Sequence, residues 1–192
     1  MPGGRPRSFD ADAALDRALE VFWRQGYEGT SLSDLTAAMR INRPSLYATF
    51  GNKEELFGKA LARYADGPAA HAGEALEAST GREVVERLIR GAVELTTGDD
   101  TPHGCLAVNS VHACGPDSTP VRHKAVAHRK AAEVALRRRL EQATDLPPGY
   151  QPDTLARLVH TITDGIAVQA VSGRGRDELR HVADLALRAL FG

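Results

Sequence analysis

Residues 30–57, with the sequence TSLSDLTAAMRINRPSLYATFGNKEELF, decide the fold. Their pattern indicates two short helices joined by a tight turn. Asn42 is a favoured helix N-cap, and Pro44, whose φ is already close to the helical value, suits the first turn of the second helix. Leu46 and Phe50 lie four residues apart and therefore share the inward face of that helix. The stretch is predicted to be a helix-turn-helix.

The outward face of this pair of helices is basic and rich in hydroxyl groups. Neither Asp nor Glu occurs between Leu35 and Lys53, whereas Arg40 and Arg43 are positively charged. A short helix with an apolar back and such a front suits insertion into the major groove of DNA. The first helix is capped by Ser31 or Ser33, the two hydroxyl residues at its start.

The expected DNA contacts follow from position on the second helix. Arg43 and Ser45 stand at its start and face base edges, while Pro44 and Ala48 approach thymine methyl groups. Thr49 contacts either a base or a phosphate. Phosphate binding at the N-terminus of the first helix is expected from these residues: Thr30, Ser31 and Ser33.

The segment resembles the DNA-binding head of the TetR-type (TetR/AcrR) transcriptional regulators. The resemblance covers about residues 9–60 and rests on Phe22, Gly26-Tyr27, Thr30-Ser31, Leu46-Tyr47, Phe50 and Lys53-Glu54-Glu55-Leu56. It implies a homodimeric repressor that binds an inverted-repeat DNA operator and is released by a small-molecule effector. It also implies that Tyr47 and Lys53 contact phosphates.

One position departs from the family pattern. Arg40 stands at the turn between the two helices, where the family usually has Gly. Gly is favoured there because such a turn commonly requires a positive φ. Arg40 therefore either accepts backbone strain or forms a different turn, and its charge suits a phosphate contact.

The rest of the chain is also predicted to be helical. Apolar residues recur at helical spacing, and alternating β-branched runs are absent, so we expect an all-α protein of about nine or ten helices. Eight of the ten aromatic residues fall in the first third, whereas the remainder relies on Ala, Leu and Val. We therefore expect a DNA-binding head with a flexible arm at residues 1–57 and a ligand-binding and dimerisation body at residues 58–192.

A short polar line marks the expected effector pocket. The stretch GCLAVN, residues 104–109, resembles the helix that borders the effector cavity in many family members. Cys105, Asn109 and His112 lie about one or two turns apart on this apolar helix. They are expected to line the pocket, and the alternative is that backbone groups satisfy them in the core.

The helix predicted at residues 153–171 is the most apolar in the chain, yet it contains His160 and Asp164. These two residues are i, i+4 neighbours, so they either pair with each other or point into the ligand pocket. A helix that is apolar nearly all round is buried or lies at an interface.

Dimerisation is expected through the last two helices, which the resemblance places in a four-helix bundle across a two-fold axis. Two reading helices on a palindrome also multiply the specificity of one. The expected interface residues are Ile162, Ile166, Val182, Leu185, Ala186 and Ala189.

The two cysteines, Cys105 and Cys114, leave open a regulator that senses thiol oxidation. If both lie on one helix, they point in opposite directions about 13 Å apart, which disfavours a disulfide between them. His103 and His112 each precede a cysteine by two positions, but this spacing is not that of a zinc site. No metal or other cofactor is expected.

Composition and motifs argue against other classes. The net charge of −1 and the pI near 6.7 do not themselves indicate a DNA-binding protein, so the basic charge must be local. Phosphate-binding Gly loops and hydrolase motifs are absent, and the only enzymatic alternative is a Cys/His pair at Cys105. Neither a signal segment nor an apolar run of about 18 residues is present, so a cytoplasmic protein without membrane contact is expected.

A second basic run spans residues 122–139, with seven Lys or Arg residues against the single acid Glu133. It is either a second DNA-binding surface or the solvated face of an amphipathic helix. We expect the solvated face, because apolar residues recur at helical spacing on its other side.

Overall fold

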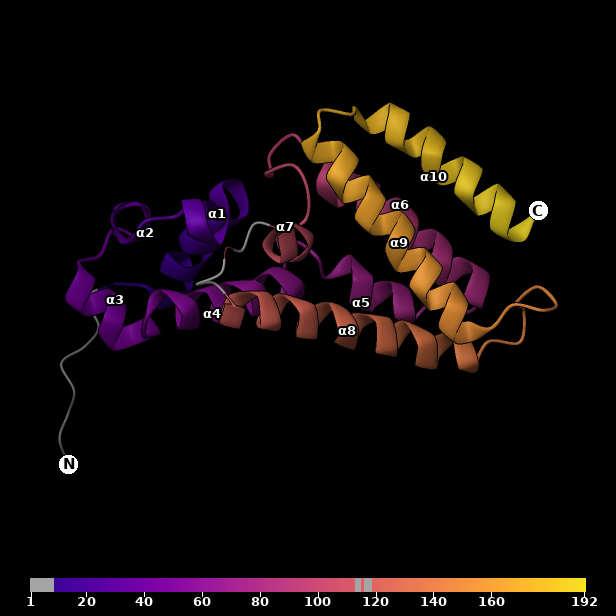
Figure 1. Ribbon diagram of the computed structural model, residues 1–192, viewed down its shortest axis with the longest axis horizontal. Helices are drawn as coiled ribbons and strands as arrows, with labels where there is room; N and C mark the ends of the chain where they lie inside the picture. The colour runs from indigo at the N-terminus through magenta and orange to yellow at the C-terminus, as the bar shows by residue number, and fades with distance from the viewer. Residues whose placement is uncertain (1–8, 113–114, 116–118) are drawn as a thin grey trace.

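The computed structural model describes residues 9–112, 115 and 119–192, without the side chain of His112. Within these residues the chain forms ten α-helices and no strand, which confirms the all-α prediction (Figure 1). The helices are α1 (Ala11–Gly29), α2 (Leu32–Met39), α3 (Arg43–Phe50), α4 (Lys53–Asp66), α5 (His71–Leu76), α6 (Gly81–Thr96), α7 (Leu106–His112), α8 (Thr119–Glu141), α9 (Pro152–Val171) and α10 (Arg176–Phe191).

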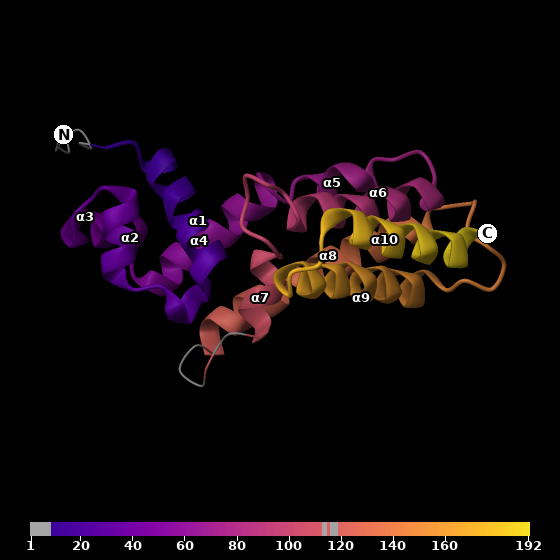
Figure 2. The ribbon, with the colours of Figure 1, turned by 90° about the horizontal axis from the view of Figure 1, so that it is seen from above.

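The molecule is elongated, with α1, α2 and α3 at one end and α5, α6, α9 and α10 at the other (Figure 2). Helix α4 leads from the first group towards the second, and α8 packs against both α4 and α9 (Figure 1). Helix α7 lies at the junction and contacts α1, α4, α8 and α9. The two ends of the molecule are therefore joined through α4, α7 and α8.

Local capping explains where the helices of the head begin. The Ser31 hydroxyl accepts a hydrogen bond from the Asp34 amide at 3.0 Å, and the Asp34 carboxylate accepts one from the Ser31 amide. This capping box selects Ser31 over Ser33 as the cap of α2. The side chain of Asn42 accepts from the Ser45 amide at 2.9 Å, which confirms the predicted cap of α3.

Arg40 adopts the strained backbone conformation and does not form a different turn. It lies at the C-terminal end of α2 in the left-handed region, with φ 57° and ψ 41°. Its amide donates to the Ala37 carbonyl, and the following Ile41 amide donates to the Thr36 carbonyl. The turn thus keeps the conformation that Gly would favour, at the cost of strain in an L-residue.

A kink interrupts α1 near its end. Gly26 adopts φ 70° and ψ 173°, outside the helical region, and the helix then continues to Gly29. Thr30 then ends the helix, with its amide donating to the Tyr27 carbonyl. The kink turns the end of α1 and brings Thr30 into the interior, where it is 1% exposed.

Apolar side chains from the first four helices form one core. Its members there are Ala14, Ala18, Leu19, Phe22, Trp23, Leu35, Met39, Leu46, Phe50, Leu56, Phe57, Ala60, Leu61 and Tyr64. The same core takes in Leu106 and Ala107 of α7 and Val121 of α8. It extends along α4 beyond residue 57, so the proposed domain boundary lies inside a continuous helix.

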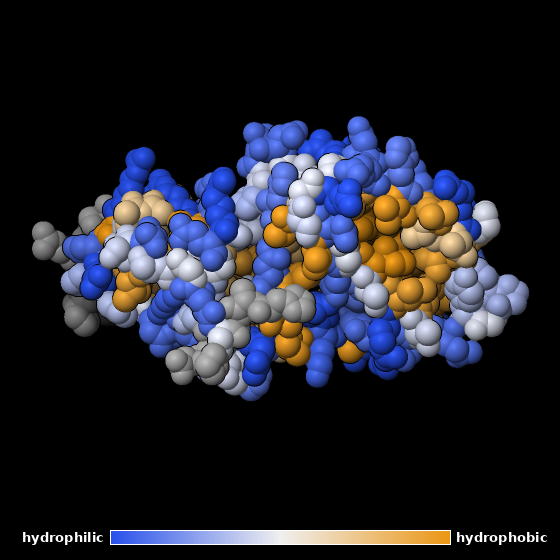
Figure 3. Space-filling view, turned by 45° about the horizontal axis from the view of Figure 1, so that its top comes forward, coloured by the Kyte–Doolittle hydropathy of each residue, from blue (hydrophilic) through white to orange (hydrophobic). Residues whose placement is uncertain are grey.

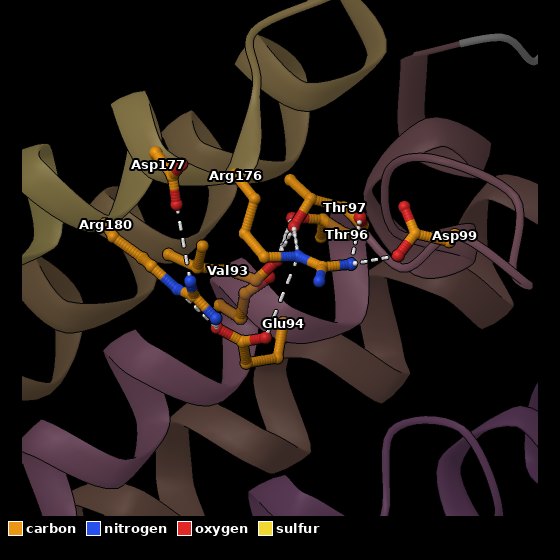
Figure 4. A network of polar contacts seen from close by, with 9 residues as sticks. Val93, Glu94, Thr96, Thr97, Asp99, Arg176, Asp177 and Arg180 are labelled. Carbon is orange, nitrogen blue, oxygen red and sulfur yellow. Dashed lines mark hydrogen bonds and ion pairs between the residues drawn. The ribbon is translucent and has the colours of Figure 1, made fainter.

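A second core joins α6, α8, α9 and α10. Its larger members are Val84, Val85, Ile89, Val93, Leu136, Leu140, Leu155, Val159, Ile166, Leu179, Leu187 and Leu190. Helix α10 is fixed on α6 by two arginines (Figure 4). Arg176 donates to the Thr97 carbonyl at 2.7 Å, and Arg180 pairs with Glu94 at 2.9 Å. A cation at the C-terminal end of α6 is favourable for the helix dipole.

No helix in the described part of the chain is both long and apolar enough to cross a membrane.

The left-handed turn at Arg40 predicts the effect of substitutions there. Arg40→Val should lower the free energy of unfolding by about 1 kcal/mol or more, because a β-branched residue tolerates positive φ poorly. Arg40→Gly should not lower it, since Gly adopts this conformation without strain. Guanidinium chloride unfolding measures both, and Arg40→Ala controls for loss of the side-chain charge. Equal stability of the Val and Ala variants would contradict the left-handed turn.

Candidate DNA-binding surface and ligand cavity

Helix α3 presents the outward face that its sequence predicts. Leu46 and Phe50 are buried against the head core. Pro44, Tyr47 and Ala48 are exposed, with 48% of the Tyr47 surface accessible to solvent. Arg43 is also exposed, and the remaining outward positions are half-buried: Ser45 and Thr49. The helix thus has a free front that a nucleic acid groove can accept.

The two helices of the motif are linked on their outer side. The guanidinium of Arg43 donates a hydrogen bond to the hydroxyl of Ser33 at 3.2 Å. The Ser31 hydroxyl accepts from the Asp34 amide in the cap of α2. Ser31, Ser33 and Arg43 therefore lie on one continuous polar surface at the starts of α2 and α3.

Lys53 is the first residue of α4 and is held in place by its surroundings. Its ammonium nitrogen lies 4.3 Å from the centre of the Tyr27 ring, a distance that suits a cation–π contact. Partial burial lowers the pKa of Lys53, and the carboxylates of Glu28 and Asp34 oppose this shift. The charge at this corner of the head therefore has a defined position.

Thr30 does not lie on this surface, and its expected phosphate contact is wrong. Its hydroxyl donates to the Gly26 carbonyl at 2.6 Å, and the residue is 1% exposed. The side chain closes the kinked end of α1 instead of facing solvent.

A cavity of about 140 Å³ lies between α4, α5, α6, α7, α8 and α9. Three residues expected in the effector pocket line it: Cys105, His160 and Asp164. Asn109 does not line this cavity, so its expected place in the pocket is wrong. The side-chain amide of Asn109 instead lies against Gly104. A Cβ atom added to Gly104 would be 3.1 Å from the Asn109 amide nitrogen. The side chain of His112 and all of Cys114 lie outside the described residues.

Asp164 does not depend on His160 for a partner. Its carboxylate forms an ion pair with Arg129 of α8, across the cavity wall. The sequence analysis predicted Arg129 to lie on a solvated helix face. This prediction was wrong for Arg129, because the spacing of residues along one helix does not reveal which neighbouring helix covers them. Both charges of this pair line the cavity.

Three further polar residues line the cavity, and they belong to no sequence motif that would have predicted this. Tyr64 comes from α4, His71 from α5 and His128 from α8. They are far apart in the chain, and only the packing of three helices brings them together. Burial lowers the pKa of His71, His128 and His160, so these imidazoles are uncharged at neutral pH.

The basic run on α8 is only partly a solvated face. Arg122, Lys130 and Arg138 are exposed, as expected. Lys124 pairs with Glu54 of α4 at 2.6 Å, and Arg139 donates to the Ala78 carbonyl at 2.6 Å. Several of these cations therefore tie α8 to neighbouring elements.

No group of three or more His, Cys, Asp or Glu residues suited to a metal ion occurs among the described residues.

An apolar groove runs between α9 and α10 on the outer side of the second core. It has a volume of about 670 Å³, and Ile162, Val182 and Ala186 line it. Ile166 forms its floor and is 2% exposed, so this side chain belongs mainly to the core of its own chain. Leu185 is 62% exposed, and Ala189 is also exposed. Figure 3 shows apolar side chains gathered on this part of the surface.

A helix-turn-helix with a free basic front, carried on a helical body with a cavity, defines a DNA-binding regulator. Residues 14–60 match the family model described as bacterial regulatory proteins, tetR family. The chain is 35% identical to the HTH-type transcriptional repressor ComR of Escherichia coli K12, over 96% of this chain and 90% of ComR. The chain therefore belongs to the TetR family and is a DNA-binding transcriptional regulator.

Other relatives agree over nearly the whole length. The HTH-type transcriptional repressor BdcR of Escherichia coli K12 is 26% identical over 97% of this chain and 92% of BdcR. A cysteine-substituted form of the TetR family regulator CifR, solved with a 26-base-pair operator duplex, is 41% identical with a TM-score of 0.91. That match covers 97% of this chain and 100% of CifR.

The half-buried histidines of the cavity, His71, His128 and His160, should make the stability of the protein depend on pH. Because their pKa values are lowered in the folded protein, the unfolded chain binds more protons as the pH falls through the ordinary histidine range. The free energy of unfolding should therefore decrease from about pH 7.5 to about pH 5.5. Guanidinium chloride unfolding at each pH measures it.

A matched variant tests whether these three residues cause the pH dependence. Replacing His71, His128 and His160 together by Asn should flatten it, whereas Val134→Asn at an exposed position of α8 should leave it unchanged. An unaltered slope in the triple variant would show that other groups cause the pH dependence.

Proposed function

We propose that the protein is a homodimeric repressor that binds an inverted-repeat operator and is released from it by a small molecule bound in the cavity. The observation that carries this proposal is the course of α4, which begins with Lys53 beside the exposed face of α3 and reaches the cavity at Tyr64, near its C-terminal end. The relatives ComR and BdcR are named repressors, and CifR has been solved with operator DNA. This role requires no catalysis, and we place it in the cytoplasm, where operators are found.

The proposed DNA contacts follow the exposed front of α3. Arg43 and Ser45 face base edges, and Pro44 and Ala48 approach thymine methyl groups. Thr49 contacts a base or a phosphate. The proposed phosphate contacts are Ser31, Ser33, Tyr47 and Lys53.

The proposed dimer joins the α9–α10 faces of two copies. Leu185, Val182 and Ala189 are exposed on α10, and the groove lined by Ile162 and Ala186 lies beside them. An apolar surface of this kind marks an interaction site. A two-fold axis through it would present two copies of α3 to the two halves of a palindrome.

Several contacts are placed to couple the cavity to the head. The indole N–H of Trp23 in α1 donates to the Gly104 carbonyl at 2.9 Å, directly before Cys105 in the cavity wall. The Trp23 ring also packs edge-on against Tyr64, with 4.9 Å between centroids. A ligand that shifts α4 or α7 would therefore shift α1.

Ligand binding lowers operator affinity only if the effector binds the two conformations of the protein with different affinities. The effector has to bind more tightly to the head spacing that does not fit DNA. A coupling of about 1–3 kcal/mol would lower operator affinity by about 5- to 150-fold. Under this proposal the head at residues 1–57 and the body at residues 58–192 are distinct in role, although α4 belongs to both.

The phosphate role of Lys53 is tested by its salt dependence. Lys53→Ala should weaken binding to all duplexes alike and lower the slope of log affinity against log salt by about one. Fluorescence anisotropy with an operator and a scrambled duplex measures both quantities. Lys130→Ala, at an exposed position on α8, should change neither. A changed sequence preference in Lys53→Ala would contradict a phosphate role.

The dimer interface is tested at its most exposed apolar residue. Leu185→Glu should shift the protein towards monomers, because a carboxylate at the centre of an apolar interface loses its hydration without gaining a partner. Sedimentation velocity measures the shift, and circular dichroism verifies the fold. Val134→Glu, which places the same charge at an exposed position of α8, should leave the dimer intact. A dimeric Leu185→Glu protein would move the interface elsewhere.

A further inference from the structure

Two charged side chains meet in the wall of the cavity. Arg129 of α8 and Asp164 of α9 form an ion pair, and both line the cavity. The pair is within reach of a ligand, because 28% of the Arg129 side chain and 29% of the Asp164 side chain are accessible. A guanidinium carries five N–H donors in a planar fork, which is more than one carboxylate can occupy. Arg129 is therefore able to bind a second acceptor group.

The rest of the wall limits the size of the ligand and is largely apolar. Leu88 and Leu95 of α6 and Val108 of α7 are among its apolar members. The cavity has a volume of about 140 Å³, and engineered protein cavities of about 150 Å³ bind benzene. The cavity therefore suits a small molecule with a compact apolar body and one polar head group at the ion pair.

The sign of the head group follows from how the wall can change its charge. His71, His128 and His160 are uncharged because burial lowers the pKa of each, and an imidazole takes up a proton when an anion enters beside it. A cation could be balanced only if Tyr64 or Cys105 lost a proton, since a guanidinium keeps its own. Burial raises the pKa of Tyr64 well above its usual range. The wall thus gains positive charge more readily than it loses it, which favours an anionic ligand.

His160 is placed to take up the compensating proton. Burial lowers its pKa, the carboxylates of Asp164 and Glu133 oppose this shift, and the Arg129 guanidinium adds to it. Among the described residues, α6 and α7 contribute no charged side chain to the cavity lining. A ligand carboxylate on Arg129 would cancel the effect of the guanidinium and leave Asp164 in need of a partner. A protonated His160, one turn before Asp164 on α9, provides that partner.

Resting on the proposed role of this cavity as the effector site, we propose that the effector is a small carboxylic acid with a compact apolar body, whose carboxylate binds Arg129 in competition with Asp164. The planar fork of a guanidinium matches a carboxylate. Binding draws Arg129 away from Asp164 and so loosens α8 from α9. Helix α8 is also tied to α4 by the pair of Lys124 with Glu54, the neighbour of Lys53, so the change reaches the DNA-facing end of α4.

The test compares three probes of similar size against the full-length protein by isothermal titration calorimetry at about pH 7.5, where carboxylic acids are ionised. Benzoate is an anion, benzyl alcohol is uncharged and benzylamine is a cation. The wild-type protein should bind benzoate at least about tenfold more tightly than either other probe. Failure of benzoate to bind, or equal or tighter binding of either other probe, would overturn the proposal.

The same titrations count the proton. Heats measured in two buffers of different ionisation enthalpy should show the uptake of about one proton for each benzoate bound, because His160 becomes charged. The affinity for benzoate should therefore decrease as the pH rises above neutrality. Benzoate binding without proton uptake would overturn the exchange of partners at Asp164.

Substitutions of the two members of the pair should have opposite effects. Arg129→Gln should weaken benzoate binding by at least about tenfold and leave the affinity for benzyl alcohol unchanged. Asp164→Asn should strengthen benzoate binding, because the competing carboxylate is gone, and should bring proton uptake close to zero. Arg138→Gln, which removes an exposed cation of α8, is the matched control and should change neither quantity.

Circular dichroism verifies the fold of each variant. If Arg129→Gln does not fold, the sign of the change in Asp164→Asn still decides. Weaker benzoate binding in Asp164→Asn would assign the pair a structural role and overturn the proposal.

A separate measurement of operator binding distinguishes the ligand chemistry from the proposed function. Benzoate binding that depends on Arg129 but leaves operator affinity unchanged would support the ligand class and contradict the effector role of the cavity. Operator release by an uncharged compound whose binding is indifferent to Arg129→Gln would support release and overturn the ligand class.

Discussion

The contact of Trp23 with the body is the interaction on which the arrangement of the molecule depends. This side chain is 5% exposed, packs edge-on against Tyr64 and donates its indole N–H to the Gly104 carbonyl. Such a buried hydrogen bond contributes about 0.5–1.5 kcal/mol, and leaving the carbonyl without a partner would cost about 1–3 kcal/mol. The head is therefore oriented by the wall of the cavity and not by a flexible linker. A fixed orientation is what a protein needs to place two reading helices at a defined separation.

The far end of the body is fixed in a similar way. Arg176 and Arg180 attach α10 to the C-terminal end of α6, so the inner face of α10 is committed to the core. Its outer face, with Leu185 and Val182, remains exposed. Under the proposed function, this face forms the dimer contact around the two-fold axis. The second core connects the dimer contact to the cavity, and the Trp23 contact connects the cavity to the head. The second core and the Trp23 contact are packed and hydrogen-bonded contacts in the described structure.

Local features were predictable from the sequence, and features that depend on tertiary packing were not. Asn42 caps α3 through its own neighbouring amides, so the residue and its position were sufficient to predict it. Thr30 was misplaced because its burial depends on the kink at Gly26. Asn109 was misplaced because helical spacing shows which residues share a face but not which face borders a cavity. The cavity residues Tyr64 and His71 carried no signal, since they come from separate helices.

The most direct test of the account is selection of bound duplexes from a random DNA pool by the purified, dimeric protein, followed by sequencing. A rigid junction between head and body predicts an inverted repeat whose two half-sites are separated by one fixed number of base pairs. Single half-sites, or half-sites at variable separations, would contradict the fixed orientation of the heads. Absence of any enriched sequence from the folded dimer would contradict sequence-specific DNA binding itself.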